Sequence, residues 1–378
     1  MRLKPSLVAV LVATLAAAAP AQAGPALLFD AADGKILYSE EMDDQWHPAS
    51  LTKIMTAYLA FKAIKAGRLR LDDKVICSEH ANQQPPSKIG LPVGGELTVE
   101  LALQALIVKS ANDVAIMLAE KISGSELQFV ADMNAAAREL GMTRTTFANA
   151  NGLPAFNQVS TARDLAKLAR AVSTEFPQYA PYWSMTQMRI GKIRLASHNG
   201  LLKTFEGADG LKTGFICDSG FNVVASATRN GRRLMAVVLG EPSGGERNIR
   251  AASLLEHGFQ QYGWKEMFNS STIDNVPVPP EARGPVSVRA TIQSWDCGNG
   301  RRNPAVEARR ERIKAAKAKR EKAKKANPEA KPEAVATGAD ASAGPSVKKS
   351  PSASGTPAAN VTVKKPAAST GAGSATAN

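Results

Sequence analysis

Cysteine and histidine are scarce in this chain of 378 residues, and neither occurs at the spacing of a metal site. The cysteines are Cys77, Cys217 and Cys297. They allow one internal disulfide, and the sequence leaves open which pair forms it. No C-x-x-C or H-E-x-x-H segment occurs, so we expect neither a metal ion nor another cofactor.

Long apolar runs are also missing from the body of the chain. The run at residues 7–19 follows Arg2 and Lys4, is too short to cross a bilayer, and precedes an A-x-A cleavage site. We therefore interpret residues 1–23 as a signal peptide and Gly24 as the first residue of the mature protein. The predicted product is exported, is periplasmic or associated with the cell envelope, and has no transmembrane helix.

Acidic residues are few in the last part of the chain, which holds most of the net charge of +13. Residues 301–378 contain 17 Lys and Arg against 6 Asp and Glu, a net charge of +11. Because this basic segment is rich in Ala, Lys, Ser and Pro, we predict a disordered tail. We interpret it either as a solvated spacer or as a binder of anionic envelope polymers or a membrane surface. A nucleic acid is not an expected partner.

The remaining chain combines β-type and α-type patterns and predicts an α+β fold. Strand patterns flank Asp33-Gly34 and Asn230-Gly231, which are both hairpin signals. The expected helices cover residues 50–64, 98–122, 125–140, 160–173 and 246–261. With a strand at residues 208–215, this order predicts a sandwich in which an antiparallel five-stranded sheet has helices on both faces. We place this domain at residues 24–267, followed by a short β-like extension at 268–300.

Three short polar motifs follow one another in this domain. They are Ser50-Leu51-Thr52-Lys53, Ser110-Ala111-Asn112 and Lys212-Thr213-Gly214. Each is weak alone, because an S-x-x-K match also begins at Ser346 in the tail. In this order, however, the three are close to the signature of penicillin-binding proteins and class A β-lactamases, with S-A-N in place of S-D-N.

The first motif predicts an activated nucleophile. A serine hydroxyl attacks poorly until a base removes its proton, and one helical turn places the Lys53 amine beside the Ser50 hydroxyl. Burial and a second nearby cation, here Lys212, would lower the pKa of Lys53 and make it a base. The N–H groups of Ser50 and Phe215 are the expected donors of an oxyanion hole.

The other two motifs predict the walls of the site. Ser110 can relay a proton to a leaving amine, and Asn112 can hold the lysine of the first motif or a substrate carbonyl. Lys212 and Thr213 offer a cation and a hydroxyl to a free carboxylate, and Gly214 lets a substrate backbone lie close to its strand. Such a site suits a peptide that is cut next to its carboxyl end.

Longer segments around these motifs resemble the low-molecular-mass penicillin-binding proteins that act as D-alanyl-D-alanine carboxypeptidases, the serine peptidases of family S11. The similar segments are residues 30–37, 47–56, 95–99, 149–153 and 209–214. The resemblance covers about residues 24–264. It implies a penicillin-binding-protein fold, release of the terminal D-alanine from peptidoglycan pentapeptides, and covalent trapping by β-lactam antibiotics.

The resemblance also implies roles for individual residues. The implied catalytic residues are Ser50 as the acylated nucleophile, Lys53 as its general base, and Ser110 and Asn112 as aids to proton transfer and deacylation. The implied substrate-binding residues are Lys212, Thr213, Gly214, Phe215 and Arg247. The chain departs from the family at Phe215, where a His is common, and at Gly200, where an Arg is common. Both differences concern the substrate preference.

Other functions remain as alternatives. Class A β-lactamases deacylate with a glutamate in an E-x-x-L-N-like segment, and residues 113–211 contain no such segment. An endopeptidase that cuts peptidoglycan cross-links would use the same residues and stays open. A non-enzymatic envelope-binding protein would have no need of a lysine beside the serine. D-Ala-D-Ala carboxypeptidase activity is therefore the function that we expect.

Overall fold

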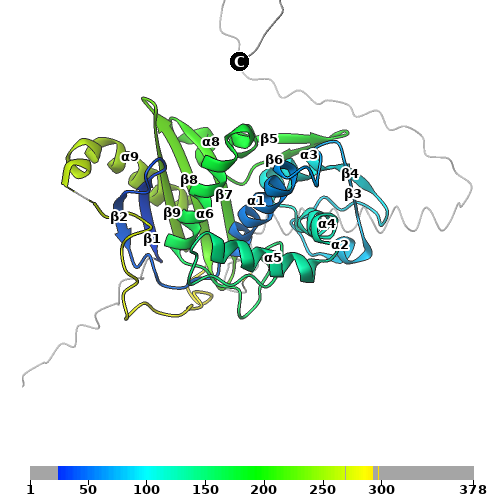
Figure 1. Ribbon diagram of the computed structural model, residues 1–378, viewed down its shortest axis with the longest axis horizontal. Coiled ribbons are helices and arrows are strands. Elements are labelled where there is room, and N and C mark those ends of the chain that lie inside the picture. Colours follow the sequence, from blue (N-terminus) through cyan, green and yellow to red (C-terminus); the bar gives the residue numbers. More distant parts are fainter. Residues whose placement is uncertain (1–23, 269, 293–296, 298–378) are drawn as a thin grey trace, which may run out of the picture. The chain divides into compact units, whose positions relative to one another are not determined.

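The main sheet of the domain has five antiparallel strands in the order β2-β1-β9-β8-β7 (Figure 1). The structure is a computed structural model that describes residues 24–268, 270–292 and 297. The strands are β1 (Ala26–Asp30), β2 (Ile36–Glu40), β7 (Ala208–Ile216), β8 (Gly220–Arg229) and β9 (Arg232–Glu241). The predicted signal peptide and basic tail lie outside the described residues.

Local turn chemistry explains the hairpin at the centre of the sheet. Arg229 and Arg232 pair across the end of β8 and β9, and Asn230 and Gly231 form the connection. Both connecting residues have positive φ angles, 50° and 75°. Two-residue turns of this kind match the twist of the flanking strands and favour Asn-Gly. The hairpin predicted from this dipeptide is therefore confirmed.

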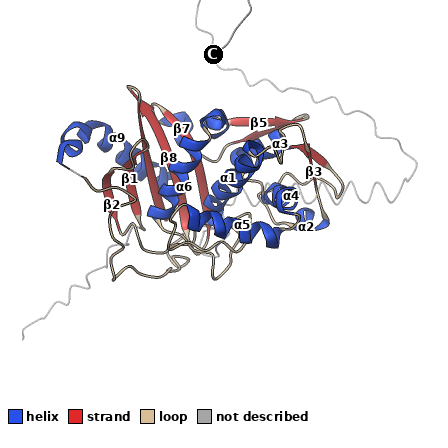
Figure 2. Cartoon of the chain, in the orientation of Figure 1, coloured by secondary structure: helices blue, strands red, loops and turns tan. Residues whose placement is uncertain are grey.

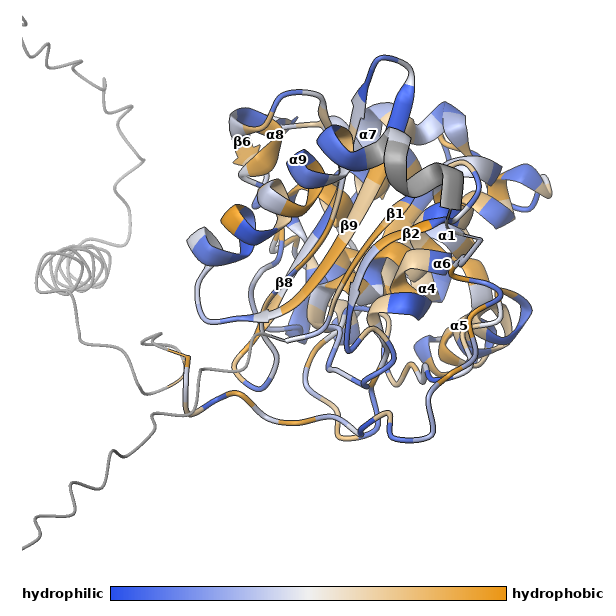
Figure 3. Cartoon of the chain, turned by 90° about the vertical axis from the view of Figure 1, so that its left-hand side faces the viewer, coloured by the Kyte–Doolittle hydropathy of each residue, from blue (hydrophilic) through white to orange (hydrophobic). Residues whose placement is uncertain are grey.

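Side chains of the strands alternate between two apolar clusters, one on each face of the sheet. On β9, Met235 and Val237 belong to the larger cluster, whereas Leu234 and Ala236 belong to the smaller one. The period of two follows from the pleat of the strand. Figure 3, coloured by residue hydropathy, shows β1 and β9 largely in the orange of hydrophobic residues. A sheet that is apolar on both faces needs helices on both, as the sequence predicts.

Helices accordingly cover both faces (Figure 2). On the larger cluster lie α1 (Thr52–Lys65), α4 (Asn112–Ser123), α5 (Glu126–Glu139) and α6 (Ala162–Glu175). On the smaller cluster lie α8 (Leu201–Thr204) and α9 (Gly244–Phe268). Short elements complete the larger layer: α2 (Glu79–Gln83), α3 (Val99–Gln104), η3 (Pro177–Tyr179), α7 (Ala180–Ser184) and the hairpin strands β3 (Lys74–Ile76) and β4 (Glu96–Thr98).

The helix expected over residues 98–122 is interrupted, and the interruption carries the second motif. After α3 the chain forms a π-helical turn, η2 (Ala105–Lys109), and then breaks at Ser110. Ser110 has φ 58° and ψ 39°, a left-handed conformation that is strained for a residue with a side chain. Single π-helical turns and strained residues of this kind are frequent at functional sites.

Residues 270–292 run as a strap along the domain and contain one isolated bridge, between Thr272 and Lys35. Ion pairs join Arg283 to Asp44 (2.6 Å) and Arg289 to Asp218 (2.9 Å). The division at residue 268 stays a prediction.

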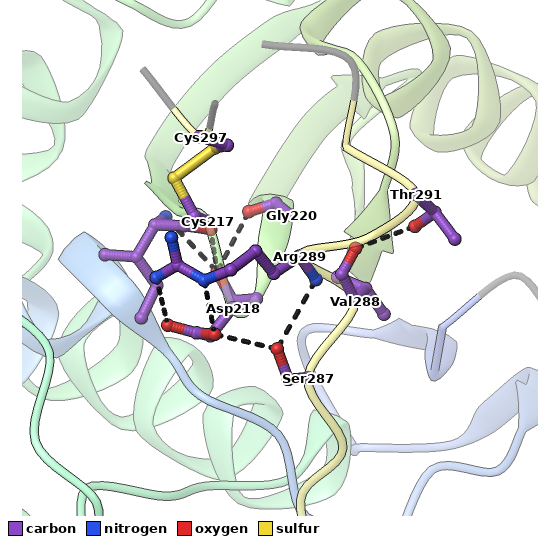
Figure 4. Close-up of a disulfide and its surroundings, with 10 residues drawn as sticks. Cys217, Asp218, Gly220, Ser287, Val288, Arg289, Thr291 and Cys297 are labelled. Atoms are coloured by element: carbon purple, nitrogen blue, oxygen red, sulfur yellow. Dashed lines mark hydrogen bonds and ion pairs between the residues drawn. A yellow bond between two sulfur atoms is a disulfide. The ribbon is translucent and has the colours of Figure 1, made fainter. Parts of the chain in front are cut away.

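A disulfide between Cys217 and Cys297 lies next to the contact between Arg289 and Asp218 (Figure 4). This bond identifies the cysteine pair that the sequence left open. The remaining cysteine, Cys77, is a free, buried thiol. Closing a loop of 80 residues typically stabilises a fold by roughly 2–4 kcal/mol. The bond joins Cys217, directly after β7, the strand of the third motif, to Cys297, which follows the strap in the sequence.

Candidate active site

Ser50 lies in a short 3-10 turn, η1 (Ala49–Leu51), at the start of α1. The residue before it, Ala49, has a φ of 50°, so the turn is strained. A side chain on Gly214 would come within 3.1 Å of the Ser50 nitrogen and 2.9 Å of the Pro48 oxygen. Glycine is therefore required at this position because β7 approaches the serine so closely. The sequence suggested a different reason, namely room for a substrate backbone.

Lys53 lies one helical turn after Ser50 and is 1% exposed. Its Nζ is 3.0 Å from Ser50 Oγ and 2.8 Å from Asn112 Oδ1, and it also donates a short hydrogen bond to the Asn151 carbonyl. The orientation of the Asn112 side-chain amide is fixed, because its Nδ2 donates to the Pro85 carbonyl (2.9 Å). Two neighbours of Lys53 are thus acceptors only, and a neutral amine has two N–H groups for them. Its lone pair is left for the Ser50 hydroxyl.

Burial favours this neutral form of the Lys53 amine. Loss of hydration lowers its pKa well below 10.5, the Lys212 cation lowers it further, and the Asp113 carboxylate opposes the change. A lysine whose pKa is lowered in this way is a better base near neutral pH than an exposed lysine. Asp113 is itself fully buried and accepts hydrogen bonds from the backbone N–H groups of Ile89 and Gly90.

Ser110 and Lys212 form the opposite wall. Lys212 Nζ donates to Ser110 Oγ (2.9 Å) and to the Thr213 carbonyl (2.8 Å). The left-handed turn at Ser110 carries its hydroxyl out of the helix and towards β7. Asn112 is held from the other side, since its N–H donates to the Ser87 carbonyl (2.7 Å). The predicted residues of all three motifs therefore meet at one place.

A groove of about 610 Å³ opens over these residues. Its lining includes Ser50, Ser110, Asn112, Thr213, Gly214, Phe215 and Arg247. Because β7 is an edge strand, alternate N–H groups on it point away from β8. Phe215 stacks on Phe221 with ring centroids 4.2 Å apart. A donor role for the Phe215 N–H stays a prediction.

Arg247, in the first turn of α9, adds a guanidinium group to the lining of the groove. It is 6% exposed, and both its Nε and its Nη2 donate to Asn248 Oδ1 (3.1 and 2.9 Å). Asn248 in turn packs against Gly200, where a side chain would lie 2.6 Å from Asn248 Nδ2. Gly200, one of the departures from the family pattern, therefore makes room for the residue that orients Arg247.

The cations of the groove affect one another. Burial, followed by the nearby Arg247, lowers the pKa of Lys212 to about 7. Burial alone lowers the pKa of Arg247 to about 10, so this guanidinium stays charged at neutral pH. In the described part of the chain no aspartate or glutamate lines the groove. The groove is therefore suited to an anionic ligand.

Asn151 is the residue of the site that sequence reasoning missed. Its segment was noted for its similarity to the family, but no role was assigned to it. Its carbonyl accepts from Lys53, and its side chain is held by a hydrogen bond from Nδ2 to Gln84 Oε1 (2.9 Å). A backbone acceptor contributed by a distant loop has no signal in a side-chain motif.

The arrangement supports acyl transfer to a serine. It provides a nucleophile, a buried amine of lowered pKa in contact with it, a second hydroxyl for proton transfer, and cations for a carboxylate. Among residues 24–268, 270–292 and 297, no group of three or more His, Cys, Asp and Glu could hold a metal ion.

Comparison with known proteins agrees with this chemistry. The family model described as D-alanyl-D-alanine carboxypeptidase matches residues 12–243. The chain is 36% identical over 264 residues to D-alanyl-D-alanine carboxypeptidase DacF of Bacillus subtilis, a match that covers 68% of this chain and 67% of that protein. Matches to other curated relatives span as little as 60% of their length.

Solved structures of similar proteins have the same fold. Penicillin binding protein 5 from Haemophilus influenzae is 35% identical, with a TM-score of 0.61 over 64% of this chain and 72% of that one. Penicillin-binding protein D2 from Listeria monocytogenes, in a cefotaxime-bound form, is 31% identical, with a TM-score of 0.58 over 63% of this chain and 97% of that one.

Proposed function

Because the chain belongs to the D-alanyl-D-alanine carboxypeptidase family of serine peptidases, we propose that it removes the terminal D-alanine from peptidoglycan pentapeptide stems. The reaction proceeds through an acyl-enzyme on Ser50. The observation that carries this proposal is the environment of Lys53: a buried amine with two fixed acceptors and its third contact, at 3.0 Å, on the Ser50 hydroxyl.

In the first step the neutral Lys53 amine takes the Ser50 proton, and the serine oxygen attacks the carbonyl carbon of the penultimate D-alanine. The negative oxygen that forms is stabilised by N–H groups, for which Ser50 and Phe215 are the candidates. When the C–N bond breaks, the proton held by Lys53 returns to the leaving amine, with Ser110 on its path. Lys53 is then neutral again.

In the second step the neutral Lys53 takes a proton from a water molecule that attacks the ester. The ester bond breaks, and Ser50 regains its proton. During the first step Lys212, Thr213 and Arg247 hold the carboxylate of the terminal D-alanine, which then leaves with the amine, since a charge-assisted hydrogen bond is stronger than a neutral one.

We also propose that β-lactam antibiotics acylate Ser50. The relative with cefotaxime bound supports this. Penicillin carries a carboxylate next to its reactive amide, so it fits the same cations. Hydrolysis of the drug ester should be slow, because a β-lactamase of class A needs a glutamate for this step and the described lining of the groove contains no carboxylate.

The proposal is tested by measuring D-alanine release from a soluble peptide that ends in D-Ala-D-Ala, alongside labelling with a fluorescent penicillin. Release of D-alanine together with a stable label supports a carboxypeptidase. Rapid turnover of penicillin without D-alanine release would indicate a β-lactamase instead. Cleavage of cross-linked peptide dimers would indicate the endopeptidase alternative.

Replacement of Lys212 by alanine should weaken substrate binding more than it affects the fold. Loss of a hydrogen bond to a charged group costs roughly 1.5–3 kcal/mol, so we expect KM to rise by about 10- to 100-fold. Steady-state kinetics on the D-Ala-D-Ala peptide checks this, with Lys74→Ala, on the exposed part of β3, as the matched control. An unchanged kcat/KM would remove Lys212 from the substrate site.

The plot of kcat/KM against pH should have a rising limb and a falling limb. At acidic pH the protonated Lys53 cannot act as a base, so kcat/KM should rise as pH increases through its lowered pKa. At higher pH, above about 7, Lys212 loses its charge and kcat/KM should fall. Lys212→Arg, which keeps the charge, should remove the second limb alone. A flat profile between about pH 6 and pH 10 would contradict both assignments.

We further propose that the protein is exported and works in the cell envelope, where its substrate is found. Within the ranges that the structure describes, none of the helices has the length and apolarity needed to cross a membrane. The basic tail of residues 301–378, with its net charge of +11, is proposed to hold the enzyme near anionic envelope polymers or to act as a spacer.

A further inference from the structure

A cationic hairpin stands beside the groove and has no role in the proposed chemistry. It consists of β5 (Gln187–Ile190) and β6 (Ile193–Ala196). Arg189 and Arg194 are directly paired across the two strands, and Lys192 lies in the connecting turn. Like charges directly opposite one another destabilise an antiparallel pair. The hairpin therefore carries a charge arrangement that works against its own stability.

The direction of these arginines is set by the other face of the hairpin. Met188 and Leu195 pair with each other, Met188 is 4% exposed, and both pack against the larger apolar cluster. Since neighbouring residues of a strand point to opposite faces, Arg189 and Arg194 must point to solvent. Both are exposed, and within the described residues neither has an ion pair or a hydrogen bond from its side chain.

The hairpin is close to the substrate groove. Both of its strands pack against η2, whose last residue, Lys109, lines the groove and is followed by Ser110. Figure 1 shows the hairpin near α3, the helix that leads into η2. Positive charge thus extends from Lys212, which contacts Ser110, and from Arg247 and Lys109 in the groove lining, to the exposed Arg189 and Arg194 of the hairpin.

We infer that this face binds carboxylates of a long substrate beyond the D-Ala-D-Ala end, so that the enzyme prefers polymeric, anionic peptidoglycan to short neutral peptides. The inference rests on the proposed function and names the substrate class of the same site. An unpaired arginine fork on a fixed hairpin can bind a carboxylate with two hydrogen bonds. A second carboxylate-bearing stem on the same strand would supply that carboxylate while the first stem occupies the groove.

The test compares the full chain with the double variant Arg189→Gln/Arg194→Gln. Two substrates are used: soluble, uncross-linked peptidoglycan strands with free stem carboxylates, and a blocked tripeptide that ends in D-Ala-D-Ala. At low salt we expect the variant to lose about tenfold in kcat/KM on the strands. No change is expected on the tripeptide or in the rate of penicillin acylation. High salt should remove the difference, because it screens exposed charges.

The matched control is Lys121→Gln/Arg138→Gln, which removes the same charge from exposed positions on α4 and α5. An equal loss in the control would overturn the inference, as would a loss on the tripeptide or no loss on the strands. If the wild-type protein released D-alanine from neither substrate, the proposed function would fail. Low-salt retention of the three proteins on the same strands, immobilised on a solid support, would then decide the inference, since weaker retention of the hairpin variant alone supports it and equal retention refutes it.

Discussion

The Ser50→Ala variant is expected to lose D-alanine release and covalent penicillin binding together, each by on the order of 10⁴-fold or more. Both reactions need the same oxygen atom, and within the described residues the hydroxyl hydrogen-bonded to the Lys53 amine is that of Ser50. Intact-protein mass spectrometry after incubation with penicillin measures the adduct, and a D-alanine assay measures the peptidase reaction.

Ser87→Ala is the matched control for the nucleophile. Ser87 also lines the groove, but its hydroxyl donates to the Lys109 carbonyl (2.9 Å) and does not contact Lys53. This variant should still form the penicillin adduct at a rate close to that of the wild-type protein. A covalent adduct on the Ser50→Ala protein would assign the reaction to another residue.

Replacing Lys53 with methionine, which keeps the length of the side chain but not the amine, should reduce acylation by about 10²- to 10⁴-fold, the usual contribution of a general base. The nucleophile would remain in place but keep its proton. The rate constant of acylation by penicillin is the measurement of choice, because it reports the first chemical step without substrate turnover.

The control for this variant is Lys62→Met in the same helix. Lys62 is partly exposed and pairs with Glu139 (2.8 Å), away from the groove lining, so its loss should leave acylation unchanged. The residual rate of Lys53→Met should also lose the acidic limb of its pH profile, an effect that a purely structural role would not produce. A variant that kept both its rate and its pH dependence would exclude Lys53 as the base.

The basic groups at the groove also explain why the base can work at neutral pH. Lys53, Lys212 and Arg247 are all buried, and the described groove lining contains no carboxylate. Burial and the neighbouring Lys212 charge both lower the pKa of Lys53, and so favour its neutral, basic form. The same field attracts the carboxylate of the substrate.

Much of the fold and the core of the site could be predicted from local patterns in the chain. The Asn230-Gly231 turn, the alternation along β9 and the one-turn spacing of Ser50 and Lys53 each depend on backbone geometry over a few residues. Such geometry is the same wherever the segment occurs. The order of the three motifs, and the resemblance that it supports, then allowed distant segments to be assigned to one site.

Features that depend on contacts between distant segments required the tertiary structure. The pairing of Cys217 with Cys297, the carbonyl of Asn151 as a partner of Lys53, and the closeness of Gly214 to Ser50 all join residues with no local relation. The break at Ser110 could not be predicted from the sequence for a related reason. The surrounding residues favour a helix, and the packing of the site overrides that preference. Propensity and spacing act along the chain, whereas burial, and with it the low pKa of Lys53, arises only when the walls of the groove come together.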